Sequence, residues 1–197
     1  MKRVRWAGLA AAVLLVAWGT DSRAATWMID ESHSGVGFAV KHMMITNVKG
    51  QFTKLSGKVV GDLARPTRAR VEVEIDATSI DTRNAKRDAH LRSADFFNTA
   101  KHPQITFRSK RIKKARGKLQ VHGQLTMNGQ TRPLKLTVAE LSKPIKGPFG
   151  KTRVGLSASG TIDRRKWGLK WNKAMDKGGL VVGNKVAIFL DVQLIKK

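Results

Sequence analysis

Alternation of apolar and polar residues runs through most of this 197-residue chain and constrains its fold more than any other feature. Between residues 70 and 76, Val71, Val73 and Ile75 alternate with charged residues, and segment 186–194 has Val, Ile or Leu at every second position. Because successive side chains of a β-strand point to opposite faces, each such segment has one face suited to burial and one suited to water. The sequence therefore predicts an all-β protein.

About eight such segments follow one another, separated by turns rich in Gly, Pro and Asn. Asn128-Gly129 lies between two of them and is a strong signal for a tight β-hairpin. A flat sheet of eight strands, each with one apolar face, would expose its two edges and its apolar side. Closure into a barrel pairs the edges and turns the apolar side inward. We predict an eight-stranded antiparallel barrel, which is either filled by its own side chains or wide enough for one slender ligand.

The first 24 residues have the pattern of a secretory signal peptide. Lys2, Arg3 and Arg5 precede an apolar run that is too short to cross a bilayer comfortably, and Ser22 and Ala24 are small residues at the expected cleavage positions. We expect cleavage after residue 24, a single domain over 25–197 and a bacterial periplasmic location. The chain has no cysteine, so an exported form depends on its core rather than on disulfides.

The formal charge of the whole chain is +24, and removal of residues 1–24 with their four basic and one acidic side chains leaves +21. A field of this size attracts polyanions, and outside the cytoplasm anionic membrane surfaces are abundant partners. The alternative is a basic barrel that binds single-stranded nucleic acid or another polyanion at its surface, with bases stacked on Trp27, Trp167 or Trp171. Basic residues are spread along the chain and export disfavours this alternative, so we expect no nucleic-acid partner.

One segment, Arg87–Pro103, breaks the alternation between two strand-like tracts. It predicts a short helical insert near residues 84–100 that Pro103 would stop, because the residue before a proline favours extended geometry. Its large apolar residues are Leu91, Phe96 and Phe97, a thin stripe that suits a segment lying across an opening of the barrel better than one filling a core.

The five histidines do not form a convincing metal site. His33 and His42 are nine residues apart, and an odd separation along a regular strand places two side chains on opposite faces. No two histidines are four residues apart, the spacing of a helical zinc pair. We expect no metal and no other cofactor.

The sequence contains two possible catalytic arrangements. His90 could act with Asp88 or Asp95 as acid and base, or Ser34 could be a nucleophile beside His33. Ser34 lacks the strand-to-helix elbow of such nucleophiles, and adjacent residues on a strand point apart. The charged groups of the helical segment have a second interpretation, a hydrogen-bonded network that fixes the helix to the barrel rim. We expect no catalytic residues.

Several motifs, in order along the chain, suggest a family. They are Ile29-Asp30 with His33-Ser34, GFAVKHMMITNVKGQF at 37–52, SIDTRNAKRDAHLRSADFFNTAKHPQITF at 79–107, GQLTMNGQTRPL at 123–134 and IDRRKWGL at 162–169. From Trp27 to the C-terminus the chain closely resembles the YceI-like family of polyisoprenoid-binding, lipocalin-like periplasmic proteins. The resemblance implies a lipocalin-like barrel that carries or stores one isoprenoid lipid, such as a polyprenyl or a quinone with its tail. It also implies that the protein is not an enzyme, and it makes a homodimer plausible.

The resemblance further implies that inward-facing residues line the lumen and that polar residues surround its mouth. The expected lumen residues are Phe38, Val40, Phe52, Val71, Val73, Ile105, Phe107, Leu119, Val121, Leu125, Leu134 and Leu136. The expected mouth residues are His33, His42, Arg87, Asp88, His90, Asp95 and, on a late loop, Trp167. The chain departs from the family pattern in its lack of tyrosine, its basic surface and a tryptophan at 167, where a phenylalanine or another large apolar residue is expected.

Overall fold

The structure is a computed structural model that describes residues 24–175 and 178–197, so the predicted signal peptide, apart from Ala24, lies outside the described residues. The strands are β1 Thr26–Ile29, β2 Gly35–His42, β3 Thr46–Phe52, β4 Leu55–Val60, β5 Arg70–Asp76, β6 Ile80–Asp81, β7 Gln104–Ala115, β8 Lys118–Met127, β9 Gln130–Leu141, β10 Ile145–Lys146, β11 Thr152–Asp163 and β12 Val182–Lys196. The α-helix is α1, Ala85–Arg92, and 3₁₀ turns occupy Glu31–His33, Pro66–Arg68, Ala77–Ser79, Pro148–Gly150 and Arg164–Trp167.

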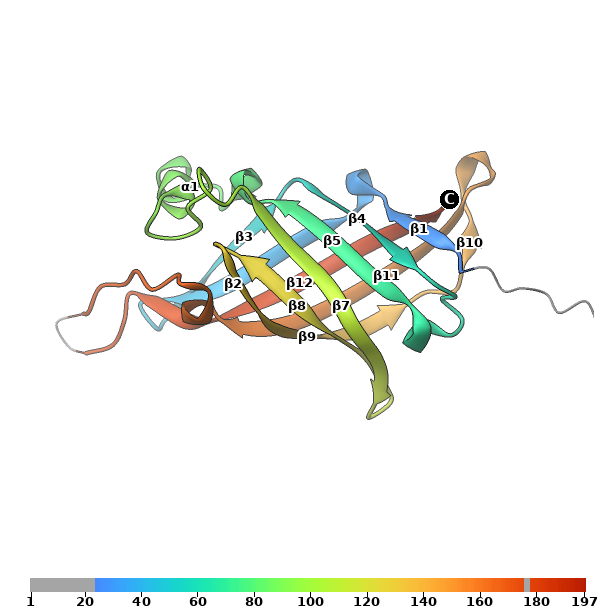
Figure 1. Ribbon diagram of the computed structural model, residues 1–197. Coiled ribbons are helices and arrows are strands. Elements are labelled where there is room, and N and C mark those ends of the chain that lie inside the picture. The colour runs from blue at the N-terminus through green and yellow to red at the C-terminus, as the bar shows by residue number, and fades with distance from the viewer. Residues whose placement is uncertain (1–23, 176–177) are drawn as a thin grey trace, which may run out of the picture.

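The strands close into an antiparallel barrel with eight positions around its wall (Figure 1). The last strand, β12, pairs with β11 on one side and with both β1 and β2 on the other, so β1 and β2 share one position. In the same way, β3 pairs with β2 and β4 pairs with β1, and these two strands share the next position. From there the ring continues through β5, β7, β8, β9 and back to β11. The prediction of an eight-stranded antiparallel barrel is confirmed.

The alternation that predicted the strands also sets which side chains face inward. On β7, Phe107 is buried and Arg108 is exposed, and Phe107 lies across from Val73 on β5 and Leu125 on β8. The expected hairpin between β8 and β9 is present, with φ of 48° at Asn128 and 68° at Gly129. Both central residues of such a turn need positive φ, which Asn and Gly adopt readily. The register between these strands is therefore fixed by local sequence as well as by burial.

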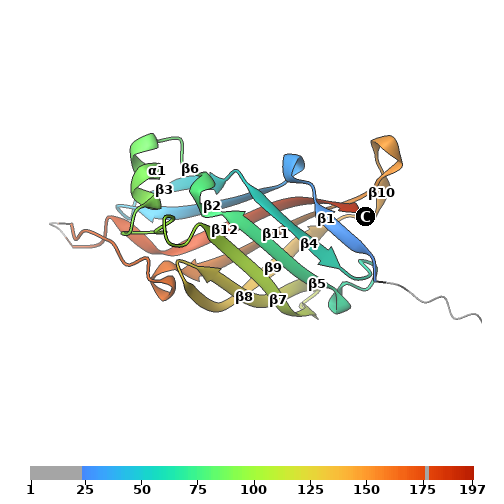
Figure 2. The same cartoon turned by 45° about the horizontal axis from the view of Figure 1, so that its top comes forward.

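The helix α1 lies at one end of the barrel, and β10 projects at the other end (Figures 1 and 2). Asn84 caps α1, because its side-chain oxygen accepts a hydrogen bond from the Arg87 amide (3.0 Å). The helix ends at Arg92, earlier than the predicted insert, since the turns that follow it donate the amides of Phe97 and Thr99 to the free carbonyls of its last turn. No helix among the described residues is long and apolar enough to cross a membrane.

Candidate functional site

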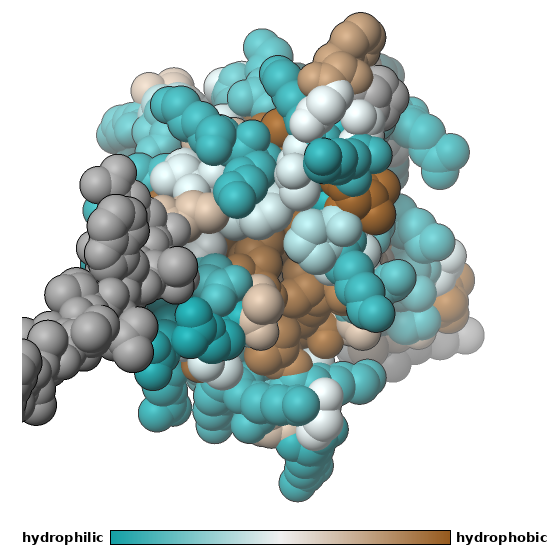
Figure 3. Space-filling model, turned by 90° about the vertical axis from the view of Figure 1, so that its right-hand side faces the viewer, coloured by the Kyte–Doolittle hydropathy of each residue, from teal (hydrophilic) through white to brown (hydrophobic). Residues whose placement is uncertain are grey.

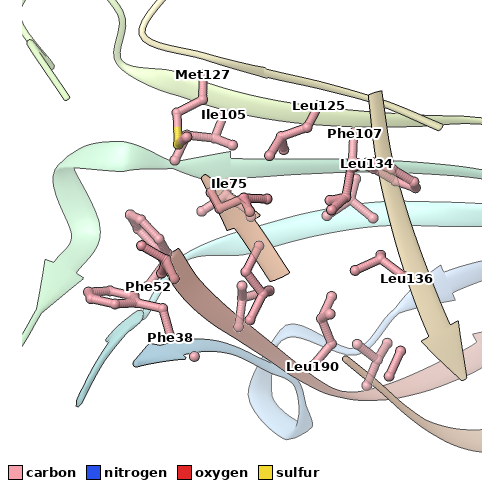
Figure 4. A pocket seen from close by; sticks show the side chains of 18 of the residues that line it. Phe38, Phe52, Ile75, Ile105, Phe107, Leu125, Met127, Leu134, Leu136 and Leu190 are labelled. Atoms are coloured by element: carbon pink, nitrogen blue, oxygen red, sulfur yellow. The ribbon is translucent and has the colours of Figure 1, made fainter. Parts of the chain in front are cut away.

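The barrel encloses an apolar cavity of about 230 Å³. In Figure 4, Phe38, Phe52, Phe107, Leu136 and Leu190 come from different strands and surround a common space. Among the described residues that line this cavity, Arg164 alone carries a polar side chain. Because an apolar cavity of about 150 Å³ stays dry and takes up small hydrocarbons, a space of this kind suits an apolar ligand.

Eleven of the twelve expected lumen residues lie in the cavity wall. They are Phe38, Val40, Phe52, Val71, Val73, Ile105, Phe107, Val121, Leu125, Leu134 and Leu136. Leu119 packs against the core but does not line the cavity, although Val138, the residue opposite it on β9, does. Alternation places Leu119 on the inward face, and this face alone does not ensure contact with the cavity.

Segments that connect strands cover the cavity at the end near α1. Leu91, Phe96 and Phe97 reach it from α1 and the turns after it, and Arg164 and Leu169 reach it from the segment between β11 and β12. The ring of Phe97 packs edge-on against Phe52 of the wall, with centroids 5.7 Å apart. We call this end of the barrel, covered by residues 85–102 and 164–175, the capped end.

Arg164 organises the cap from inside. It is 3 % exposed, and its guanidinium donates to the carbonyls of Gly183 (2.9 Å), Leu169 (2.6 Å), Trp171 (2.9 Å) and Val182 (3.3 Å). Burial lowers the pKa of Arg164 below its usual value. Its charge is thus held by carbonyl dipoles, and the polar atoms are directed into the cap rather than into the cavity.

Among the described residues no carboxylate pairs with Arg164, and the adjacent Asp163 is bound by Arg165 instead. The Asp163 carboxylate accepts hydrogen bonds from the Arg165 guanidinium (2.6 and 3.0 Å), which lower the pKa of Asp163 to about 2. Arg164 was not among the expected site residues. In the sequence it is one of two adjacent arginines after a strand-like segment, and nothing in that pattern distinguishes the buried arginine from the exposed one.

Two of the expected mouth residues, Arg87 and Asp88, meet on Thr82. The buried Asp88 carboxylate accepts from the Thr82 amide (2.9 Å) and hydroxyl, and Arg87 donates to the Thr82 hydroxyl and carbonyl (both 2.8 Å). These bonds join α1 to the chain just after β6. Neither side chain lines the cavity, so they fix the cap in place.

The other pair on this segment, His90 and Asp95, lies on the outer surface of the cap. His90 Nε2 and Asp95 Oδ2 are 2.8 Å apart, and the His90 ring packs edge-on against Phe96 and Trp171, with centroids 5.0 and 4.8 Å away. The pair therefore joins the two segments of the cap, one after β6 and one before β12. It has no contact with Asp88 among the described interactions.

The three remaining expected mouth residues make none of these contacts. His33 belongs to a 3₁₀ turn after β1, at the end of the barrel away from α1, where its Nδ1 is 3.0 Å from Asp30 Oδ2. His42 is the last residue of β2 and pairs with Thr46 and Val182. Trp167 is 1 % exposed, and its indole N–H donates to the Leu125 carbonyl (3.0 Å), so it is a packing residue and cannot be part of a polar mouth.

At the end away from α1, every described residue that lines the cavity belongs to a strand; examples are Ile29, Val138, Leu156 and Leu194. Figure 3 views this end and shows apolar side chains at the floor of a recess framed by hydrophilic ones. We call the face formed by β1, β10 and the adjacent strand ends the open end. A ligand that enters here need not displace the cap.

A polar network stabilises the outer wall at the open end. The Asp30 carboxylate accepts from Ser32 Oγ (2.7 Å), Gln193 Nε2 (2.7 Å) and Arg153 Nη1 (2.8 Å). The hydrogen bond from Ser32, with those from Gln193, His33 and Arg153, holds the pKa of Asp30 well below its usual range. This network ties the end of β1 to β11 and β12, and it gives Asp30 and His33 a structural role.

The proposed nucleophile and metal ligands do not come together. Ser34 Oγ accepts from the Gln193 amide (3.0 Å), and the histidine ring nitrogen near it in sequence contacts Ser32 and Asp30 instead. Within residues 24–175 and 178–197, no group of three or more His, Cys, Asp or Glu side chains is placed to hold a metal ion. Trp27 and Trp167 are buried, so they cannot offer the stacking surface that surface binding of nucleic acid would use.

An eight-stranded antiparallel barrel around an apolar lumen is the architecture of lipocalin-like binding proteins. Within that class, the family model of the YceI-like domain matches residues 27–194, and the chain belongs to this family. Protein YceI of Escherichia coli O157:H7 is 39 % identical over 165 residues, covering 83 % of this chain and 85 % of the relative. A UPF0312 protein of Staphylococcus epidermidis is 38 % identical over 158 residues, covering 80 % and 90 %.

Solved structures show the same fold. The YceI protein of Campylobacter jejuni has a TM-score of 0.65 at 29 % identity, covering 80 % of this chain and 90 % of that one. BcnA of Burkholderia cenocepacia has a TM-score of 0.72 at 23 % identity, covering 84 % and 98 %. A structure from Saccharophagus degradans, described as a polyisoprenoid binding domain implicated in plant cell wall breakdown, has a TM-score of 0.61 at 16 % identity, covering 87 % and 98 %.

Proposed function

We propose that the protein binds one polyisoprenoid chain, such as a polyprenyl or the tail of a quinone, in the barrel and carries or stores it in the bacterial periplasm without chemical change. The observation that carries the proposal is the cavity wall, which is apolar from Ile29 at the open end to Phe97 under the cap. The description of the Saccharophagus degradans domain as polyisoprenoid binding supports the same ligand class. The periplasmic location rests on the predicted signal peptide.

Shape rather than apolar burial selects the ligand in this proposal. Each buried CH₂ group contributes about 0.8 kcal/mol relative to water, but a bilayer offers the same chain nearly the same gain. A narrow closed wall instead favours a single slender chain over a phospholipid with two tails. The branched methyl groups of an isoprenoid match a wall built from Val, Leu, Ile and Phe.

The test is organic extraction of the purified, never-denatured protein followed by mass spectrometry. We expect an isoprenoid in near-stoichiometric amount. A blank extract from protein whose fold is verified by circular dichroism would refute the proposal and would favour a barrel that functions without a lumen ligand.

Matched variants locate the ligand. Phe107→Asp places a charge in the cavity wall and should abolish ligand retention or folding, whereas Arg108→Asp, one residue along β7 and exposed, should do neither. Val73→Phe keeps the wall apolar while it fills part of the cavity, so it should fold and retain less isoprenoid. Full isoprenoid content in folded Val73→Phe would show that the lipid binds outside the lumen.

A further inference from the structure

The loop between β9 and β11, residues 142–151, projects beyond the barrel at the open end (Figure 1). It exposes two large apolar side chains, Ile145 (62 % exposed) and Phe149 (96 % exposed). Phe149 also has a φ of 61°, a left-handed conformation that is unfavourable for a bulky residue. Packing within the described protein therefore gives no reason for a phenylalanine at this position.

The loop is basic as well as apolar. Lys143, Lys146 and Lys151 are exposed beside the two apolar residues, and the sequence has no Asp or Glu between Glu140 and Asp163. The loop keeps a defined shape, because β10 pairs with β11 and the Gly147 amide donates to the Lys151 carbonyl (2.9 Å) at the tip. Apolar tips framed by lysines are suited to the boundary between lipid head groups and acyl chains.

We propose that this loop docks the open end of the barrel onto an anionic lipid bilayer, with Ile145 and Phe149 inserted among the acyl chains and the three lysines against head-group phosphates. Docking in this orientation turns the apolar recess of Figure 3 toward the membrane. A chain can then pass between bilayer and cavity with little exposure to water. That use rests on the proposed function, whereas docking itself requires only the loop.

The chain supplies its own control at the capped end. The turn between β2 and β3 exposes Met43 (44 %), Met44 (58 %) and Ile45 (78 %), so it matches the loop in exposed apolar residues. Docking through that turn would present the cap rather than the recess to the membrane. The two sites therefore make opposite predictions about which substitutions matter.

The test measures co-flotation of the purified protein with vesicles of phosphatidylcholine alone or of equimolar phosphatidylcholine and phosphatidylglycerol. Ile145→Ser combined with Phe149→Asn should weaken binding to the anionic vesicles by about tenfold or more. Neutralising Lys143, Lys146 and Lys151 as glutamines should cost about fivefold per lysine on anionic vesicles and almost nothing on neutral ones. Met44→Asn combined with Ile45→Ser should leave binding unchanged.

Binding that is lost in the Met44→Asn, Ile45→Ser variant but kept in the Ile145→Ser, Phe149→Asn variant would overturn the proposal. It would also be overturned if the loop variant only converted a dimer into a monomer in light scattering, because the loop would then contact a second copy. Isoprenoid content separates the two proposals. If the protein contains isoprenoid but the loop substitutions do not change its vesicle binding, docking alone is refuted. If it contains no isoprenoid but the loop substitutions weaken its vesicle binding, isoprenoid carriage alone is refuted.

Discussion

The two ends of the barrel are built on different principles. At the capped end, segments outside the strands cover the cavity, and polar side chains such as Arg164 and Asp88 hold them from within. At the open end the cavity wall consists of strands, and the polar network of Asp30 lies on the outer wall. A cap held by buried hydrogen bonds is costly to open, since each buried group left unpaired costs about 1–3 kcal/mol. We therefore expect the capped end to move less than the open end.

The largest loss of stability is expected from substitution of Arg164 at the capped end. Arg164→Met supplies an apolar side chain of similar length but removes the guanidinium from four carbonyls, of which that of Val182 still accepts from the Asn172 side-chain amide (2.7 Å). We expect it to lower the free energy of unfolding by about 4 kcal/mol. Urea denaturation followed by tryptophan fluorescence measures this as a shift of the midpoint. The same substitution at Lys166, an exposed residue of the same turn, should leave the midpoint nearly unchanged. Equal midpoints for both variants would show that the cap does not depend on the buried guanidinium.

A smaller effect is expected at Asp30 of the open end. Asp30→Asn loses the ion pair with Arg153 and should lower the free energy of unfolding by about 2 kcal/mol at pH 7. The pKa of Asp30 lies below its ordinary value of 3.8 in the folded protein, so its carboxylate stabilises the fold above about pH 4, and this contribution is lost as the pH falls from there toward the lowered pKa.

Denaturation of both proteins at several pH values checks the Asp30 prediction. The stability gap between wild type and Asp30→Asn should narrow below about pH 4, because Asp30 of the unfolded chain begins to bind a proton there while the folded carboxylate stays ionised. A gap that stays constant down to acid unfolding would mean that hydrogen-bond geometry, rather than the charge of Asp30, stabilises this end. Isoprenoid content should not change, since the network lies on the outer wall.

Alternation predicted the barrel because burial on one face leaves a strand only one register. That is why eleven lumen positions, from Phe38 to Leu136, lie on the cavity wall. Alternation gives the face of a side chain but not its contact with the cavity, and Leu119, on the inward face of β8, does not line it. It also does not tell which strand ends meet, and His33, expected at the mouth, lies in the turn between β1 and β2 rather than with Arg87 and Asp88.

The cap was the least predictable region because its contacts join segments far apart in sequence. The sequence showed that residues 84–100 break the pattern, but the early end of α1 depends on turns that return to its last carbonyls. The burial of Trp167 and Arg164 depends on where the segment between β11 and β12 folds back. Of the two interpretations of the charged helix, the hydrogen-bonded network describes Arg87 and Asp88.

The smallest effect should come from the pair on the outer surface of the cap, His90 and Asp95, and it tests the comparison of the two ends most directly. Asp95→Asn weakens a half-exposed pair with His90 and should lower the free energy of unfolding by about 0.5 kcal/mol. If the ligand leaves through the open end, the exchange rate of bound isoprenoid into vesicles should match that of wild type, whereas the Ile145→Ser, Phe149→Asn variant should exchange more slowly. Exchange that is severalfold faster in Asp95→Asn would instead place the exit at the capped end, because only opening of the cap depends on the bond between His90 and Asp95.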